Sequence, residues 1–299
     1  MDEMNLPALI ERFGSEDKCR AYLEELRWPD GVECPRCQSK NISRIRERNQ
    51  YECSKCRYQF SVTAGTLFHD SHLPLWKWFL AAYLIVESKK GISAKQLQRM
   101  LKVSYKTAWY LAHRIRDAMG DAEQRPLIGI IEADETWHGG KRSGHGSGPY
   151  ASGNKTTIVG AVERGGEIRL RMVAGRDRGT ISRFLGEVVA DRAQAIYTDD
   201  WVGYKGIGDV DTKHRVVNHA HKEWVRGDVH TNTVENVWSL FKRSVIGSYH
   251  QVSVKHLPAY LDELEWRYNN RDSRYLFRDT VTALVGADPL TYQRLIEVR

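Results

Sequence analysis

The stretch Leu127-Ile128-Gly129-Ile130-Ile131-Glu132-Ala133-Asp134-Glu135 decides the fold of the second half of the chain. Its opening residues are apolar and rich in isoleucine, which predicts a buried β-strand over Leu127–Ala133. Two acidic residues follow directly, so this strand is expected to deliver carboxylates to one edge of a sheet. The stretches Thr156–Val162 and Ile168–Val173 are also β-rich and predict two further strands.

The segments that follow alternate between helical and strand-like patterns. Apolar residues at helical intervals predict a helix over Ile181–Val189, and Ala195–Tyr197 predicts a short strand just before Asp199. Arg215–Val217 suggests a fifth strand, and an apolar stripe predicts a late helix over Val234–Val245. This order of strands and helices fits an α/β domain with an RNase-H-like mixed sheet.

Three acidic residues stand out by their positions in this pattern. Asp134 ends the first strand, Asp199 follows the fourth, and Glu235 lies in the first turn of the late helix. If those two strands are neighbours, the aspartates lie close together and the helix adds the glutamate. Converging carboxylates repel one another unless a divalent cation lies between them, and oxygen-only ligands suit Mg²⁺ or Mn²⁺. Two such ions about 4 Å apart would hold the attacking and leaving oxygens of a phosphoryl displacement.

Each acid taken alone is explained as well by a solvated surface position, so only the joint placement favours a metal site. Lys242 follows Glu235 by seven residues, about two helical turns, and is therefore expected on the same helix face, where it would meet a phosphate. Neighbouring residues compete for the same roles, and these alternatives are Glu132, Glu135, Asp200 and Asn236.

Four of the five cysteines form two Cys-x-x-Cys pairs, Cys34 with Cys37 and Cys53 with Cys56. Each pair can bind one ion from a tight turn, and together they match a four-thiolate zinc site flanked by the short strands of a zinc ribbon. Four thiolates leave no open position, so the zinc is expected to be structural. Disulfides are the alternative, but the odd number of cysteines argues against them. The remaining Cys19 is expected to be a small core residue.

A helix-turn-helix is expected after the ribbon. Ser93 can cap a short helix that carries Leu97 and Leu101, and Ser104 can cap a second helix with apolar residues at helical intervals. Two short helices joined in this way form a DNA-binding motif, although an ordinary helical hairpin is the alternative. The residues expected to contact DNA are Lys102, Ser104, Tyr105 and Lys106.

The chain has 299 residues and a net charge of +7, which suggests about two domains and an uneven basic surface. Residues 34–60 carry seven lysines and arginines against two acids, and residues 88–119 carry eight against one. These stretches favour a polyanionic partner such as DNA over a merely solvated face. No apolar run is long enough to cross a bilayer and no secretory signal is readable, so a soluble, cytoplasmic protein is expected.

Over nearly its full length the chain resembles the DDE transposases of bacterial insertion sequences, specifically the group with an N-terminal zinc ribbon and an RNase-H-like catalytic domain. The chain is expected to divide into an N-terminal helix and zinc ribbon (1–68), a helix-turn-helix segment (69–122) and a catalytic domain (123–299). Besides the ribbon cysteines, the resemblance rests on Thr63-Ala64-Gly65-Thr66-Leu67-Phe68-His69, Thr107-Ala108-Trp109, Ala133-Asp134-Glu135-Thr136-Trp137, Gly139-Gly140-Lys141, Tyr197-Thr198-Asp199, the run from His230 to Arg243, and Tyr268-Asn269-Asn270-Arg271.

The resemblance implies that Asp134, Asp199 and Glu235 form the acidic triad, with Asp134 bridging two Mg²⁺ ions, Asp199 binding one and Glu235 the other. A water would attack a phosphodiester at the end of the element and free a 3′-OH, which would then attack target DNA. The ribbon and the helix-turn-helix would bind the terminal repeat, and the joining of two ends implies a homodimer or a larger assembly. The residues that would hold phosphates are Lys141, Lys242 and Arg243.

Two other functions share most of these features. A zinc-ribbon and helix-turn-helix regulator with an inactive RNase-H-like domain would bind DNA but would not depend on the acids. A structure-selective nuclease on the same fold would cut DNA without joining it. A strand-transfer assay with labelled end DNA and Mg²⁺ separates these two functions from transposition.

Overall fold

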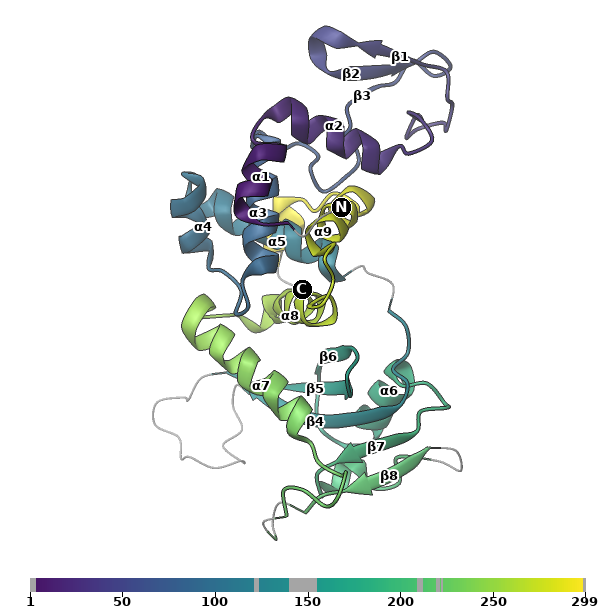
Figure 1. Cartoon of the computed structure of the whole chain (residues 1–299), viewed down its shortest axis with the longest axis vertical. Helices are drawn as coiled ribbons and strands as arrows, with labels where there is room; N and C mark the ends of the chain where they lie inside the picture. The colour runs from purple at the N-terminus through teal and green to yellow at the C-terminus, as the bar shows by residue number, and fades with distance from the viewer. Residues whose placement is uncertain are drawn as a thin grey trace. The chain divides into compact units, whose positions relative to one another are not determined.

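The chain forms two compact units, of which the first comprises Met1–Ala122 with Asn270–Arg299 and the second comprises Glu123–Asn269 (Figure 1). The computed structural model describes residues 4–120, 124–139, 155–208, 212–218, 221 and 223–297. Residues 270–299, expected from the sequence to belong to the catalytic domain, belong by their contacts to the first unit, and the boundary expected after residue 68 lies inside that unit.

Aromatic side chains from helices distant in sequence form a core in the first unit. The ring of Phe13 lies 4.8 Å from that of Tyr22 and 5.1 Å from that of Phe79. Phe277, near the C-terminus, lies 5.7 Å from Phe13 and 5.9 Å from Phe79, so its helix belongs to the same core. The helices of this unit are α1 (Leu6–Phe13), α2 (Glu16–Arg27), α3 (Leu75–Glu87), α4 (Ala94–Leu101), α5 (Tyr105–Gly120), α9 (Leu276–Gly286) and α10 (Tyr292–Ile296).

The ribbon is a small antiparallel sheet in the order β1-β2-β3. Trp28, Tyr51 and Phe60 pack beside it, with ring centroids 5.4–5.9 Å apart. The alternating stretch from Tyr58 onward forms only a two-residue strand, because the backbone turns at Ser61, whose carbonyl accepts the Ala64 N–H at 3.1 Å. The strands are β1 (Ile42–Ile45), β2 (Gln50–Cys53) and β3 (Gln59–Phe60), with a 3₁₀ turn at Arg46–Arg48.

The second unit is built on a five-stranded mixed sheet with the order β6-β5-β4-β7-β8 (Figure 1). The β4, β5 and β6 strands are antiparallel, whereas β4, β7 and β8 are parallel. This sheet, with β4 in the middle and helices on both faces, confirms the RNase-H-like mixed sheet expected from the sequence. The strands are β4 (Ile130–His138), β5 (Thr156–Glu163), β6 (Ile168–Val173), β7 (Ala195–Thr198) and β8 (Lys213–Val216).

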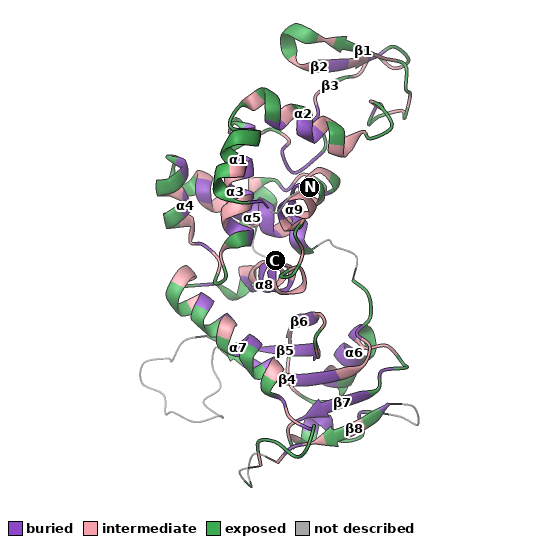
Figure 2. Ribbon diagram, viewed as in Figure 1, coloured by how far each residue is buried: buried purple, intermediate pink, exposed green. Residues whose placement is uncertain are grey.

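Side chains on the two faces of the sheet pack into two separate hydrophobic cores. Ala133 and Val159 pack on one face with α6 (Arg178–Val188), and Ile158 and Val162 pack on the other with two later helices. Figure 2 shows the middle strands largely buried and the edge strand β8 more exposed. The helices on the second face are α7 (Asn232–Ser244) and α8 (Leu257–Asn269), separated by a π-helical turn at Val245–Tyr249 and a 3₁₀ turn at Val254–His256.

The central strand differs from the one expected from the apolar run. The sequence predicted a strand over Leu127–Ala133, whereas β4 continues to His138 because β5 pairs with it from Ile131 onward. Its parallel pairing with β7 stops at Glu132. Asp134 therefore lies within a strand, just past the point where the parallel pairing ends. None of the helices in the described residues is long and apolar enough to span a membrane.

Candidate functional site

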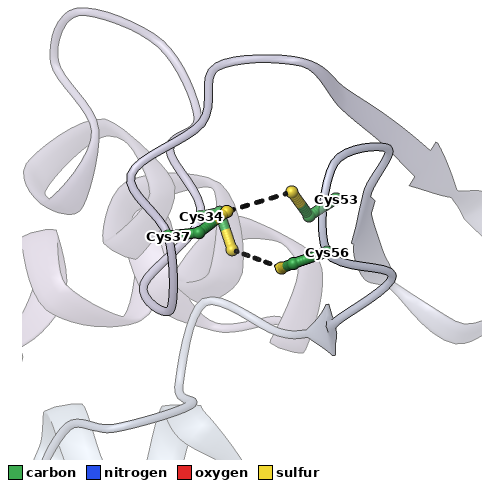
Figure 3. A group of neighbouring side chains, drawn as sticks. All are labelled: Cys34, Cys37, Cys53 and Cys56. Carbon is green, nitrogen blue, oxygen red and sulfur yellow. Dashed lines mark hydrogen bonds between the residues drawn. The ribbon is translucent and has the colours of Figure 1, made fainter.

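The four ribbon cysteines converge on one point. The sulfurs of Cys34 and Cys56 are 3.7 Å apart and those of Cys37 and Cys53 are 3.5 Å apart (Figure 3). All four lie within 4.8 Å of one another, and they are free thiols rather than disulfides. Zinc–sulfur bonds of about 2.3 Å in a tetrahedron place sulfurs about 3.8 Å apart, so the geometry fits a structural zinc ion.

The two cysteine turns are built alike. The Gln38 N–H donates to the Cys34 carbonyl at 2.9 Å and the Arg57 N–H donates to the Cys53 carbonyl at 2.8 Å, and both donors have left-handed backbones with φ 58°. Burial opposes ionisation of Cys53, but backbone N–H groups of Cys56 and Lys55 point at its sulfur and lower the pKa to about 6. A thiolate is therefore readily available to a cation at this site.

A second candidate site lies where β4 and β7 separate in the second unit. Glu132 pairs with Tyr197 at the end of the parallel ladder, so two residues further along Asp134 and Asp199 occupy corresponding positions. The backbone N–H of Trp201 donates to Asp199 Oδ1 at 3.0 Å and orients that carboxylate. The first and fourth strands of the sheet are therefore neighbours, as the sequence interpretation required.

The α7 helix brings Glu235 to the same face of the sheet as Asp134. Trp238, one turn after Glu235, donates its indole N–H to Asp134 Oδ2 at 3.0 Å. The indole lies over Gly160, the β5 partner of Asp134, where an added Cβ would come within 2.6 Å of the ring. Glu235 is exposed, and its Oε1 accepts the Thr231 hydroxyl at 2.8 Å. Close approach of α7 thus depends on a residue without a side chain.

Asp134 is a strongly perturbed acid. Burial raises its pKa to about 8, and the negative charges of Glu135 and Asp199 act in the same direction, against the hydrogen bond from Trp238. The hydrogen bond from Trp238 therefore does not offset the cost of burying the ionised carboxylate beside two other acids. Asp134, Asp199 and Glu235 do not form a closely spaced set of ligand atoms like that of the four cysteines, which is the one such group among the described residues.

Glu132, which the sequence offered as an alternative metal ligand to Asp134, instead anchors the start of α7. Its side chain is fully buried, and Oε2 accepts the backbone N–H groups of Thr233 at 2.6 Å and Val234 at 3.1 Å. Its Oε1 accepts Arg164 Nε at 2.6 Å and the Thr233 hydroxyl at 2.9 Å. Thr231, the residue before the helix, does not cap it with its side chain, so Glu132 supplies that cap from β4.

Glu135 points to the opposite face of β4. It is buried, and its Oε2 accepts the Tyr204 hydroxyl at 2.8 Å while Oε1 lies 3.5 Å from Arg176 Nη1. Burial raises its pKa in spite of the hydrogen bond from Tyr204. The other two alternatives, Asp200 and Asn236, are exposed.

Two family models match the parts just described. The ISXO2-like transposase domain matches residues 126–269, and the transposase zinc-ribbon domain matches residues 14–59. The chain is also 33% identical over 280 residues to an uncharacterized protein in transposable element ISH50 of Halobacterium salinarum, which covers 86% of this chain and 92% of that relative. The chain belongs to the ISXO2-like transposase family.

Solved structures bear a weaker likeness to this transposase. A chain of the Mos1 strand transfer complex is 10% identical with a TM-score of 0.30, covering 71% of this chain and 78% of that one. A chain of the simian T-cell lymphotropic virus intasome bound to PP2A regulatory subunit B56 gamma is 13% identical with a TM-score of 0.26, covering 74% and 73%. Likeness at this level carries no conclusion about the transposase.

The helix-turn-helix candidates lie at the α4–α5 turn of the transposase. Ser93 accepts the Gln96 N–H at 3.1 Å and Ser104 accepts the Thr107 N–H at 3.0 Å, so both expected caps are present. Lys106 Nζ lies 4.2 Å from the centre of the Tyr292 ring in α10. All four candidates are exposed or half-buried, and these are Lys102, Ser104, Tyr105 and Lys106.

The phosphate-binding candidates fall in two places. Lys242 and Arg243 are exposed in the last turn of α7, where the Lys242 carbonyl accepts the Val245 N–H and its ammonium group has no partner among the described residues. Arg243 Nε donates to the Ser239 carbonyl at 3.2 Å. Lys141 and most of its glycine-rich loop lie outside the described residues.

Sequence reasoning missed the residues that support the acids. Glu132 and Asp134 are two residues apart in one strand, so alternation alone places them on the same face, but it does not show that Glu132 contacts α7. The sequence offered no signal for the Trp238–Asp134 hydrogen bond or for the pairing of Arg176 with Glu135. Both depend on which distant segments pack together.

Proposed function

We propose that this transposase binds the ends of its insertion element, cuts them by Mg²⁺-dependent hydrolysis and joins them to target DNA. The observation that carries the proposal is that Asp134 lies two residues past the end of the β4–β7 ladder and Asp199 follows β7 directly, with Trp238 holding Asp134 to the helix that bears Glu235. Family membership supports the same reaction.

The donor set fits hard divalent cations. Asp134, Asp199 and Glu235 offer only carboxylate oxygens, and the pKa of Asp134 is raised by burial and then by the negative charges of Glu135 and Asp199, which a cation would compensate. Asp134, Asp199 and Glu235 would hold these cations. When bound, Mg²⁺ or Mn²⁺ ions supply positive charge beside the attacking and leaving oxygens.

The reaction consists of two exchanges at phosphorus. In the first, a water oxygen bonds to the phosphorus at the element end, and the 3′ oxygen of the element leaves and takes a proton. In the second, that 3′-OH loses its proton and bonds to a target phosphorus, and the 3′ oxygen of the target leaves. Each exchange replaces one phosphorus–oxygen bond with another, so no external energy source is required.

The first unit would supply DNA affinity. The ribbon and the α4–α5 turn carry the basic stretches of the chain, and Lys102, Tyr105 and Lys106 are exposed at that turn. In the second unit, Lys242 and Arg243 would hold phosphates near the acids, and Lys141 would add a third cation. Joining two element ends would require a homodimer or a larger assembly.

A strand-transfer assay with labelled element-end duplex and Mg²⁺ tests the proposal. Wild-type protein should give joined product, and Asp134→Asn or Glu235→Gln should reduce it about a thousandfold or more while DNA binding persists. Asp200→Asn, an exposed neighbour of Asp199, is the matched control and should retain activity. Cleavage without joining would support a nuclease instead. Binding without any reaction, in wild type and Asp134→Asn alike, would support a regulator.

A further inference from the structure

A cavity of about 600 Å³ lies between the end of β4 and the C-terminal part of α7. Its wall combines two aromatic rings, Trp137 and Phe241, with the ammonium group of Lys242 and the imidazoles of His138 and His250. No acidic side chain lines it among the described residues. A flat apolar surface with cationic and hydrogen-bonding neighbours matches the chemistry of a nucleotide.

Trp137 is an exposed indole that the protein holds in place. It lies three residues after Asp134 and is 41% exposed. The guanidinium carbon of Arg176 lies 5.3 Å from the centre of the Trp137 ring and 3.7 Å from that of Trp201. Arg176 is not among the cavity-lining residues, so it supports the indole from outside the cavity.

Buried Glu135 fixes the supporting arginine. Its carboxylate lies 3.5 Å from Arg176 and accepts the Tyr204 hydroxyl, so the guanidinium is anchored on the face of β4 that Glu135 and Trp137 share by strand alternation. An exposed tryptophan held by a buried polar network is a pre-organised platform, because little rotamer freedom remains to be lost when a ring stacks on it. Glu135 therefore acts as a support for Arg176 and Trp137, a role that is separate from the acid cluster and from the hydrophobic core.

Lys242 supplies the complementary charge. Its ammonium group has no partner among the described residues, and it follows Glu235 by about two turns of α7. A phosphate at Lys242 would lie about 10 Å along α7 from Glu235 while its base reaches toward Trp137. The floor of the cavity is fixed by His138, whose Nε2 lies 2.8 Å from the Val252 carbonyl oxygen.

We propose that this cavity holds one unpaired nucleotide of the substrate DNA, with its base stacked on Trp137 and its phosphate at Lys242. The inference rests on the proposed function and names a part of the substrate that the acids do not contact. Its consequence is that the DNA is unpaired at one position near the reacting phosphate. Stacking of this kind changes affinity by about tenfold to a hundredfold.

The test uses the full-length protein and element-end duplexes with 2-aminopurine placed at one terminal position at a time. At a single position, the fluorescence of the complex should be higher for Trp137→Ala than for wild type, because the indole no longer quenches the stacked base. A mismatch at that position should improve wild-type binding about tenfold, and Trp137→Ala should lose this preference. Trp224→Ala, at an indole 57% exposed in the same unit but outside the cavity, is the control and should match wild type.

The inference is overturned if no position distinguishes Trp137→Ala from wild type while both bind the duplex. Strand transfer by wild-type protein is measured on the same duplexes, so that failure of the nucleotide site can be distinguished from failure of the proposed function. Joined product without a Trp137-dependent base signal removes the nucleotide site and leaves the proposed function intact. A Trp137-dependent signal without joined product keeps the nucleotide site and removes strand transfer.

Discussion

The carboxyl group of Asp134 lies in surroundings that oppose its charge. It is partly buried beside Glu135 and Asp199, and one indole N–H is the side-chain donor that stabilises its anion. Such a group weakens the folded state unless a cation binds. We expect the acid to trade stability for metal affinity, as strained functional sites commonly do.

This trade can be measured as a pH dependence. The pKa of Asp134 is about 8 in the folded protein against an ordinary value of 3.8, so the folded state binds the proton more tightly. Stability from this group is fully present below the ordinary value and is lost as the pH rises through 8. Without added Mg²⁺, Asp134→Asn should therefore gain about 2 kcal/mol of unfolding free energy over wild type between pH 6 and pH 8.

Thermal unfolding of both proteins across that range checks the prediction. Burial also raises the pKa of Glu265, to about 7, but both proteins share this group and it cancels in the comparison. Mg²⁺ should stabilise wild type and have little effect on Asp134→Asn. A difference between the two proteins that stays constant with pH would contradict the assigned charge state.

At the scale of elements, the position of α7 relative to β4 decides whether the acids can meet. Glu132 holds the first turn of α7 through the Thr233 N–H, and Trp238 holds the middle of the helix through its hydrogen bond to Asp134. Gly160 lets the indole lie flat against β5. Each contact can be broken separately.

Glu132→Gln should loosen the start of α7. The amide cannot satisfy Arg164 and the helix N–H groups together, and breaking a buried pair of this kind costs about 3 kcal/mol. Hydrogen exchange of the β4 and α7 amides should accelerate accordingly. Glu187→Gln removes an exposed partner of Arg171 and should change exchange by less than about 1 kcal/mol. Equal effects of the two variants would refute the anchoring role.

Gly160→Ala should displace Trp238, since the added Cβ would lie 2.6 Å from the indole. We expect a loss of about 1–3 kcal/mol of stability and at least about tenfold in strand transfer, because Glu235 moves with the helix. Melting temperature and joined product measure both effects. Gly186→Ala in α6, where nothing lies within 4 Å of the added carbon, should instead be neutral or stabilising. Unchanged activity of Gly160→Ala would show that α7 tolerates the shift.

At the scale of the molecule, the chain returns to its first unit after completing the second. Residues 270–299 contribute Phe277 to the core formed by Phe13 and Phe79, and the Leu67 N–H donates to the Leu284 carbonyl at 3.2 Å. The second unit is thus inserted between two parts of the first. Loss of the C-terminal segment would damage the first unit before the second.

Phe277→Ala tests this organisation. Removing a fully buried ring should cost about 3–5 kcal/mol within the first unit. Hydrogen exchange should rise in α1, α2 and α3, while the amides of β4 and β5 stay protected. A parallel rise in the sheet would contradict the division into two units. Val202→Ala, at a side chain 55% exposed in the second unit, controls for an unspecific effect.

The sequence by itself determined the zinc ligands, the order of strands and helices, and the family. Cysteine spacing, strand alternation and helical stripes involve residues close together in the chain, so they can be recognised without knowing the tertiary structure. Only the tertiary structure decided that β4 extends past Asp134, that Glu132 caps α7, that residues 270–299 join the first unit, and that Trp137 faces a cavity. Each of these depends on partners far apart in sequence, whose pairing is set by packing of the whole fold rather than by any local pattern.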